Sequence, residues 1–526
     1  MSKLEKKYIE QVVTQYPQLR KKLFARGFFL TNDFVKEDQY PFYNAWKGLK
    51  IGNYRLYVSE EQAYYVEQYK DKYFVLIGHA YNPFTMCSDE KKILQTLTAY
   101  KDLDEEFFSK INELTGIFTL IIFEGEKICI IGDPTCMQTT FYTKIKHNIY
   151  VASHTNLLAD LLELQWDPYV KEMSEYRFFP LLGNALPGDL TQYKEIKRLV
   201  PNHYVILDKK DILVQRFYWP HSLKLKEEDI VKKSETIIHN NLELIAKKWR
   251  KPAISMTGGC DSKTTLACAT GIYDKFSYFS YKSSESEEVD SKAAREICKR
   301  LGLKHKVYTI SENDLDYENI EAVRAILEWN TGGIVPINRN DVRKRAFFSN
   351  IDDFDIEVKS WASEIGRAYY SKRFAGRKKF GKKPTPRKCT TLYKFFLNNR
   401  KLVRETDKVF KEYLDKYFEQ AKKDAIEWQE QFFWEYRVPS WNGLVITGEH
   451  RYSFDITIPY NNRKLLAILL SAPLESRLDD DIYKKIRKSM NPEIDAVGIS
   501  ITNLKHTKNR GIAENIYYTI HSKILF

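Results

Sequence analysis

The most constraining feature of this 526-residue sequence is a segment at 251–271, KPAISMTGGCDSKTTLACATG. Residues 252–256 are apolar enough for a short buried strand, and apolar residues recur at helical spacing from Asp261 onward. The turn between them contains Gly258 and Gly259, where backbone N–H groups can approach a ligand with no Cβ in the way. Together with the positive end of the helix dipole, these N–H groups predict an anion site suited to phosphate.

Polar side chains surround this predicted turn. Asp261 lies at its mouth, and a carboxylate beside a phosphate site makes sense when a cation such as Mg²⁺ lies between them. Thr257 and Ser262 add hydroxyl groups, and Ser255 ends the predicted strand. We therefore predict a site for a phosphate-bearing ligand formed by Ser255, Thr257, Gly258, Gly259, Asp261 and Ser262. An ordinary glycine turn before a helix is the structural alternative, and no GxxxxGK[ST] motif is present in the segment.

The motif TGGCDS at 257–262 resembles the SGGxDS pyrophosphate loop of the N-type ATP pyrophosphatases, with Thr257 where serine is usual. This resemblance implies an enzyme that splits ATP into AMP and pyrophosphate and so activates a carbonyl-type oxygen as an adenylate. It also implies that Mg²⁺ accompanies ATP, and that the strand predicted at 275–281 places Phe279 and Tyr281 near the adenine.

The composition indicates a globular chain, since 43% of the residues are hydrophobic and 14% aromatic. No apolar run approaches the roughly 18 residues of a membrane-spanning helix, and the first residues, MSKLEKKYIEQ, do not resemble a signal peptide. Seven cysteines without CxxC pairs favour reduced thiols in a cytoplasmic protein that does not contact a membrane. The net charge of +13 suggests an anionic partner, so a nucleic-acid partner stays an open alternative.

The region before the loop is rich in predicted strands. Short β-branched and aromatic runs at 116–124, 127–133, 140–144 and 149–153 predict an antiparallel meander closed by a helix at 154–164. Their order, followed by LPGDLT and IKRLVPNHY, resembles the N-terminal half of asparagine synthetases and β-lactam synthetases. The resemblance implies an N-terminal α+β domain of the Ntn-hydrolase type at residues 1–220.

In the glutamine-using members of that family, the nucleophile is a cysteine exposed by removal of the initiator methionine. This sequence has Ser2 there, and the first cysteine is Cys87. We therefore expect no glutaminase activity and a role for this half in scaffolding, in binding a partner or in shaping the synthetase cleft.

The region after the loop alternates strands and helices. Strands are predicted at 252–256, 275–281, 305–310 and 355–359, with a helix at 286–301, which indicates a parallel sheet covered on both faces. Ligands bind such sheets at the carboxyl ends of the strands. The predicted fold class is therefore α/β, with the antiparallel domain followed by a parallel-sheet ATP-pyrophosphatase domain and C-terminal helices at 227–526.

Two further segments are compared with the family. Asparagine synthetases place a G-x-G-x-D-E motif where this chain has SWASEIGRAYY at 360–370, and the resemblance makes Glu364 a candidate metal ligand or general base. Arg367 follows three residues later and is a candidate for binding a carboxylate or phosphate. The family's catalytic lysine falls at Tyr483, so the neighbouring Lys484 is the candidate that stabilises charge on the α-phosphate.

A basic segment at 371–388, SKRFAGRKKFGKKPTPRK, follows the Glu364 motif. It is predicted to be a flexible loop that serves as a solvated insertion, a lid over ATP, or a contact for an acidic substrate, a leader peptide or RNA.

The predicted function is an ATP-dependent, AMP-forming ligase or cyclase that transfers an adenylated carboxylate to an amine, with peptides among the candidate substrates. Members of the resembled families that lack the glutaminase cysteine act in specialised metabolism, and the resemblance implies the same setting for this chain. Two alternatives stay open: an RNA-modifying ATP pyrophosphatase, and a non-catalytic synthetase homologue that acts as a binding subunit. The oligomeric state is left open.

Overall fold

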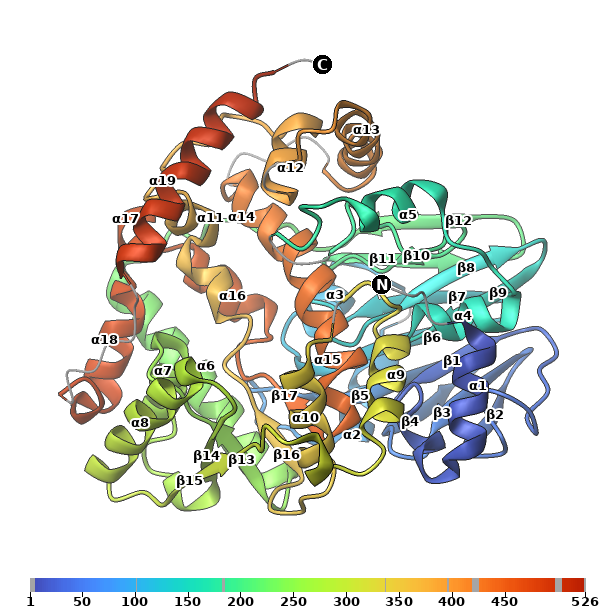
Figure 1. Cartoon of the computed structure of the whole chain (residues 1–526), viewed down its shortest axis with the longest axis horizontal. Helices are drawn as coiled ribbons and strands as arrows, with labels where there is room; N and C mark the ends of the chain where they lie inside the picture. The colour runs from blue at the N-terminus through green and yellow to red at the C-terminus, as the bar shows by residue number, and fades with distance from the viewer. Residues whose placement is uncertain are drawn as a thin grey trace.

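The computed structural model describes residues 5–100, 102–181, 185–335, 337–394, 397–418, 425–496 and 504–524. Figure 1 shows two antiparallel sheets on the right, a parallel sheet at the bottom, and C-terminal helices along the top and left. The chain is thus a mixed α/β protein, as predicted. Ser2, on which the glutaminase prediction depends, lies outside the described residues.

Two six-stranded antiparallel sheets are formed by the first 216 residues. One has the order β10 (Lys197–Arg198), β8 (Phe141–Ile145), β9 (Asn148–Ala152), β1 (Phe28–Thr31), β3 (Tyr54–Ser59), β2 (Trp46–Ile51). The other has the order β12 (Ile212–Arg216), β11 (His203–Leu207), β7 (Lys127–Gly132), β6 (Thr115–Glu124), β5 (Lys72–Tyr81), β4 (Tyr64–Tyr69).

The two sheets are stacked and covered by helices. Leu30 and Val58 of the first sheet pack with Val75 and Ile121 of the second, and all four are fully buried. The outer face of the second sheet packs against α2 (Glu90–Thr98) and α3 (Glu105–Ile111). The outer face of the first packs against α1 (Lys6–Gln15) and α4 (Thr155–Leu162). This gives four layers, helix–sheet–sheet–helix.

The predicted meander is corrected by this arrangement. The strand runs at 116–153 were located well, but β6 and β7 pair in the second sheet whereas β8 and β9 pair in the first. The strand β1 lies between β9 and β3, so the first sheet is assembled from segments more than a hundred residues apart. Such pairing leaves no local signal in the sequence.

The second half contains a five-stranded parallel sheet with the order β15 (His305–Thr309), β14 (Ser277–Lys282), β13 (Pro252–Ser255), β16 (Ile356–Val358), β17 (Asp455–Thr457). The predicted parallel sheet is therefore confirmed, and the pairs on both sides of β13 are parallel. β17 was not predicted. The chain order reverses between β13 and β16, and such a switch point is where open α/β sheets bind ligands.

The remaining helical elements fill the spaces around this sheet. Before and beside it lie η1 (Pro17–Lys22), α5 (Pro168–Glu175), α6 (Glu227–Lys248), α7 (Cys260–Cys268), η2 (Tyr273–Lys275), α8 (Glu285–Arg300), η3 (Asp314–Asp316), α9 (Ile320–Asn330) and α10 (Arg339–Phe348). After β16 come η4 (Ser363–Arg367), α11 (Tyr369–Arg373), α12 (Pro386–Tyr393), α13 (Arg400–Tyr417), α14 (Trp428–Phe432), η5 (Phe433–Arg437), η6 (Pro439–Gly443), α15 (Leu444–Gly448) and η7 (His450–Tyr452). The last are α16 (Arg463–Leu470), α17 (Leu474–Leu478), α18 (Asp481–Met490), η8 (Pro492–Ile494) and α19 (Leu504–His521).

A buried polar interface joins the two halves. Asn461 donates hydrogen bonds to the Asp133 carboxylate and to the carbonyl of Gly116, at 2.8 and 2.7 Å. Arg463 donates to the carbonyl of Gly132 at 2.9 Å. These bonds attach the segment between β17 and α16 to the second antiparallel sheet. The first half of the chain therefore contacts the parallel sheet next to β17. The domain boundary between 220 and 227 stays a prediction; β12 ends at Arg216 and α6 begins at Glu227.

Among the described residues, no helix is both long and apolar enough to span a bilayer. All seven cysteines are free thiols, as the sequence predicted. The cytoplasmic location stays a prediction.

Candidate functional site

The 257–262 loop connects β13 to α7 at the carboxyl edge of the parallel sheet. It borders a cavity of about 370 Å³ beside the switch point between β13 and β16. This volume falls in the usual range for small-molecule sites, about 300–1,000 Å³. The lining comprises Ser255, Met256, Thr257, Asp261, Ser262, Ser280, Tyr281, Glu287, Asp290, Ser291, Lys359, Ser360, Trp361, Glu364 and His450.

Hydroxyl groups hold the loop in shape. The Thr257 and Ser262 hydroxyls lie 3.0 Å apart, and the Gly259 N–H donates to Thr257 Oγ1 at 3.1 Å. Ser262 also donates to the Thr257 carbonyl at 2.9 Å. Threonine thus supplies the hydroxyl that serine supplies in the SGGxDS pattern. Gly259 has a φ of −75°, which any residue can adopt, and a Cβ there would lie 3.2 Å from Thr257 Oγ1, a tight contact.

The beginning of α7 has hydrogen-bonding capacity for an anion. Its N-cap is Gly259, and no side chain caps the first turn. The N–H groups at such a terminus are satisfied by water or by a bound anion. The Gly258 N–H donates a long hydrogen bond, 3.3 Å, to Asp290 Oδ1 on α8. Burial raises the pKa of the Asp290 carboxyl, and the charge of Glu287 adds to this effect.

Both carboxylate oxygens of Asp261 have partners in η4. Ser363 Oγ donates to Asp261 Oδ1 at 2.7 Å, and Arg367 Nη1 donates to Oδ2 at 2.5 Å. Arg367 also binds both oxygens of Asp480, at 2.8 and 2.9 Å. The sequence predicted that Arg367 would bind a carboxylate or phosphate; in the structure it bridges two carboxylates of the protein itself.

The η4 segment reaches Asp261 through a strained backbone. The residues on either side of it, Ala362 and Ala368, have φ values of 68° and 50°. Alanine seldom adopts this left-handed region, and such strain often accompanies functional sites. Glu364 and Arg367, three residues apart in the sequence, thus lie on one short 3₁₀ segment.

Glu364 lines the cavity and interacts with Asp261. Burial, with a contribution from the Asp261 charge, raises the pKa of Glu364 to about 7. Two acids with this mutual repulsion form a place where a divalent cation would be stabilised. No group of three or more ligating side chains occurs in the part of the chain that the structure describes. Because Mg²⁺ is commonly held by one or two carboxylates plus substrate phosphates, the pair suits Mg²⁺ bound with ATP rather than a protein-only metal cage.

The structure adds residues that the sequence analysis did not identify. Lys359 follows β16 and forms an ion pair with Glu357 at 2.9 Å. The rings of Trp361 and His450 lie 5.3 Å apart, and burial lowers the pKa of His450 well below its usual range. The position of Lys359 at the end of a predicted strand was a usable signal. His450 comes from a distant segment and had none.

Only one of the two aromatic residues predicted to lie near the adenine borders the cavity. Phe279 is 2% exposed and stacks on Phe354 at 4.8 Å in the core, so it does not border the cavity. Tyr281 does border it, with Lys344 5.4 Å from its ring centroid.

Lys484 points to solvent on α18 and pairs with Asp481 at 3.4 Å. Tyr483 is the inward residue instead: its hydroxyl donates to the Ser363 carbonyl at 2.7 Å. A shift of one residue turns a helical side chain by about 100°, which explains why the neighbouring lysine cannot take this place.

Searches for related proteins found neither a matching family model nor a matching curated protein. Solved structures give three weak similarities. An allosteric regulatory enzyme of purine biosynthesis is 8% identical, with a TM-score of 0.25 over 57% of this chain and 62% of the other. Glutamine phosphoribosylpyrophosphate amidotransferase from B. subtilis is 9% identical, with a TM-score of 0.21 over 69% and 74%. Glutamine-dependent NAD⁺ synthetase from Acinetobacter baumannii is 12% identical, with a TM-score of 0.17 over 31% and 32%. These scores are too low to indicate a shared fold or function.

Proposed function

We propose that this protein is an ATP-dependent, AMP-forming ligase that joins a carboxylate to an amine. The observation that carries the proposal is the position of the TGGCDS loop: it lies between β13 and α7, at the carboxyl edge of a parallel sheet, beside a cavity that also contains Glu364. The 257–262 loop and the beginning of α7 can hold phosphates, and Asp261 with Glu364 can hold the accompanying cation. A pyrophosphate-releasing reaction uses groups of these kinds.

In this proposal the ATP phosphates bind the loop N–H groups and the hydroxyls of Thr257 and Ser262. Asp261 and Glu364 would hold Mg²⁺, which neutralises charge between the phosphates and the acids. The substrate carboxylate attacks the α-phosphorus, the bond to the β,γ-phosphates breaks, and pyrophosphate leaves. An amine then displaces AMP from the acyl-adenylate. Where Asp261 alone holds Mg²⁺, Glu364 has the second role of a base: its pKa near 7 suits it to accept the proton that the amine releases.

One observation favours a second candidate, a binding subunit that does not turn over ATP. Ser363 and Arg367 occupy both oxygens of Asp261, and Tyr483 stands where the family's lysine is expected. ATP binding without AMP formation would support this candidate.

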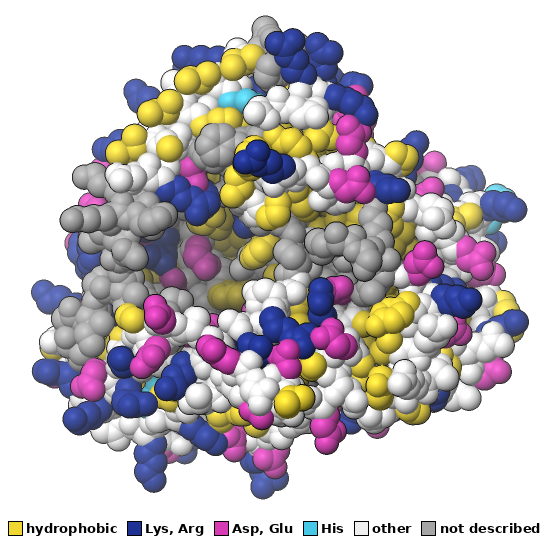
Figure 2. All heavy atoms as spheres, in the orientation of Figure 1, with side chains coloured by type: hydrophobic (Ala, Val, Ile, Leu, Met, Phe, Trp, Pro, Cys, Tyr) yellow, Lys and Arg dark blue, Asp and Glu magenta, His cyan; other side chains and the backbone are white. Residues whose placement is uncertain are grey.

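The RNA-modifying alternative depends mainly on the charge of +13. Basic side chains are interspersed with acidic ones over much of the face that Figure 2 shows. Tight, salt-sensitive binding of tRNA would favour this alternative.

The test is release of AMP and pyrophosphate from ATP with a panel of carboxylic acids, each offered with ammonia and with primary amines. We expect release that depends on one acid and one amine. Absence of both ATP binding and turnover across the panel would overturn the proposal. Asp261→Asn serves as the inactive control.

A further inference from the structure

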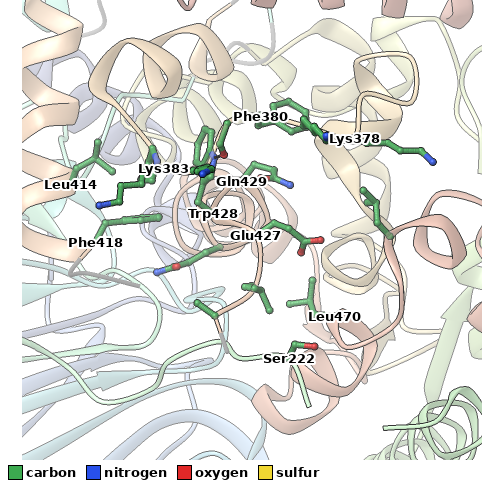
Figure 3. A pocket seen from close by; sticks show the side chains of 18 of the residues that line it. Ser222, Lys378, Phe380, Lys383, Leu414, Phe418, Glu427, Trp428, Gln429 and Leu470 are labelled. Carbon is green, nitrogen blue, oxygen red and sulfur yellow. Dashed lines mark hydrogen bonds between the residues drawn. The ribbon is translucent and has the colours of Figure 1, made fainter. Parts of the chain in front are cut away.

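A second and larger cavity lies outside the candidate nucleotide site. Its volume is about 1820 Å³, and it opens between the 378–384 segment, α13, α14 and the end of α16 (Figure 3). This is about twice the upper end of the range for small-molecule sites, about 1,000 Å³. The cavity therefore suits an extended chain better than a single metabolite.

One wall of this cavity carries free positive charge. Lys378 pairs with Glu475 at 2.9 Å, but among the described residues Lys379, Lys382 and Lys383 have no acidic partner. All four lysines are exposed. They belong to the basic segment at 371–388, for which the sequence left several roles open. Because all four lysines come from one short segment of the lining, they favour a ligand with several negative charges.

The facing walls are apolar. Leu414, Ile426, Trp428 and Leu470 line them, and each is at most 9% exposed. Figure 3 shows Leu414 and Leu470 on opposite sides of the space, with Trp428 between them. The ligand therefore needs apolar groups as well as acidic ones.

The cavity also contains a buried cation with unused hydrogen-bonding capacity. The Arg477 side chain is 2% exposed and forms ion pairs with Glu427 at 2.7 Å and Glu430 at 3.4 Å. Its Nη1 nevertheless makes no hydrogen bond, and neither does either carboxylate oxygen of Glu430. Nη1 lies 3.4 Å from Glu430 Oε1, so two carboxylates hold this guanidinium at the wall of the cavity.

A series of charged contacts links this cavity to the nucleotide site. The charge of Lys372 acts on Glu430, and Lys372 also pairs with Asp480. Asp480 binds Arg367, which binds Asp261. The wall of this cavity is thus connected to Asp261 in the 257–262 loop through Lys372, Asp480 and Arg367.

We infer that this cavity binds an acidic peptide segment, one that bears the carboxylate or the amine of the proposed ligation; the inference rests on the proposed function. RNA is a poorer match. Asp415 and Glu427 also line the space: RNA carries a phosphate at every nucleotide and would be repelled there, whereas a peptide can place apolar residues beside these two carboxylates. Single-stranded RNA is usually read by stacking on exposed aromatic rings. Trp428 is 7% exposed and is held by a hydrogen bond from its indole to the Gly381 carbonyl at 3.0 Å.

The test is fluorescence anisotropy with a fluorescein-labelled octapeptide of alternating Glu and Leu. A Lys–Leu octapeptide and an eight-nucleotide oligouridylate are the comparison probes. We expect the Glu–Leu peptide to bind the wild type, and the triple variant Lys379→Ser/Lys382→Ser/Lys383→Ser to bind it about tenfold more weakly or worse. A matched triple variant, Lys47→Ser/Lys50→Ser/Lys91→Ser, removes three exposed lysines elsewhere and should bind as the wild type does.

Equal binding by the two triple variants, or equal binding of the Glu–Leu and Lys–Leu peptides, would overturn the inference. Preferential binding of oligouridylate that the 379–383 variant loses would replace the peptide with RNA. Binding of a fluorescent ATP analogue is measured on the same samples. Lost peptide binding with intact ATP binding localises the peptide site, whereas peptide binding without any ATP binding would refute the proposed function alone.

Discussion

Glu364→Gln is expected to make the protein more stable at alkaline pH. Burial and the Asp261 charge raise the pKa of Glu364 from 4.5 to about 7. Between these values the folded chain keeps a proton that the unfolded chain has lost, so the stability of the wild type falls as the pH rises from about 4.5 to about 7. Glutamine cannot ionise, so the variant does not incur this loss.

The magnitude follows from the pKa difference. At about 1.4 kcal/mol for each pKa unit, the rise to about 7 corresponds to about 3 kcal/mol above pH 7. With an unfolding entropy of about 2.1 cal/mol/K per residue, the whole chain has about 1.1 kcal/mol/K. Unfolding as one unit would then raise the melting temperature of Glu364→Gln by about 2–3 °C at pH 8, and by little near pH 4.

The assay is thermal unfolding of the variant and the wild type from pH 4 to pH 8. Glu113→Gln is a control of opposite sign. Burial opposes ionisation of Glu113, but hydrogen bonds from Lys464 and Asn82, at 3.0 and 3.2 Å, lower its pKa. The Glu113 charge stabilises the fold at neutral pH and loses this effect as the pH falls, so its variant should be less stable than wild type at pH 8.

The same experiment with Mg²⁺ and a non-hydrolysable ATP analogue links the stability effect to function. If Glu364 is a ligand, the addition should stabilise the wild type more than Glu364→Gln. A melting-temperature difference that is the same at pH 4 and pH 8 would refute the argument that Glu364 is held in an unfavourable charged environment.

Three further predictions concern the same site. Asp261→Asn should abolish AMP formation in the pyrophosphate-release assay, and wild-type AMP production would show that the metal is placed wrongly. Lys484→Ala should leave both AMP formation and the melting temperature near the wild-type values, because the side chain is exposed and remote from the cavity. A large loss of activity would instead show that Lys484 takes part in the reaction. Tyr483→Phe removes a buried hydrogen bond to the Ser363 carbonyl and should cost about 1 kcal/mol in chemical unfolding, unless water replaces the hydroxyl.

The parts of the fold that the sequence predicted are those with local signals. A strand, two glycines and a helical pattern occur within about twenty residues around Gly259, and they fold as predicted. The pairing of β1 between β9 and β3 brings together segments far apart in the chain, so periodicity could locate the strands but not their neighbours.

The residues of the candidate site also differ in whether a local sequence motif marks them. Asp261, Glu364 and Arg367 were found because each follows or lies near a recognisable motif, and the structure places all three together. His450 enters the cavity from just after α15, and its contact with Trp361 depends on tertiary packing alone. Lys484 and Phe279 were misplaced for a different reason: the side of a helix or strand that faces a site depends on packing that the sequence pattern did not resolve.

Tyr483, at the position where the resemblance led us to expect a lysine, is best understood together with Arg367. The Tyr483 ring lies 5.8 Å from the Arg367 guanidinium, and its hydroxyl holds the η4 backbone through Ser363. The positive charge that faces Asp261 therefore comes from η4 rather than from α18. A cation that binds Oδ2 of Asp261 therefore either shares this oxygen with Arg367 or takes its place. Arg367 would not be left unpaired by such an exchange, because two of its nitrogens stay bound to Asp480. Asp480 thus keeps Arg367 close to the loop in both arrangements, where the guanidinium can balance charge that develops on a phosphate.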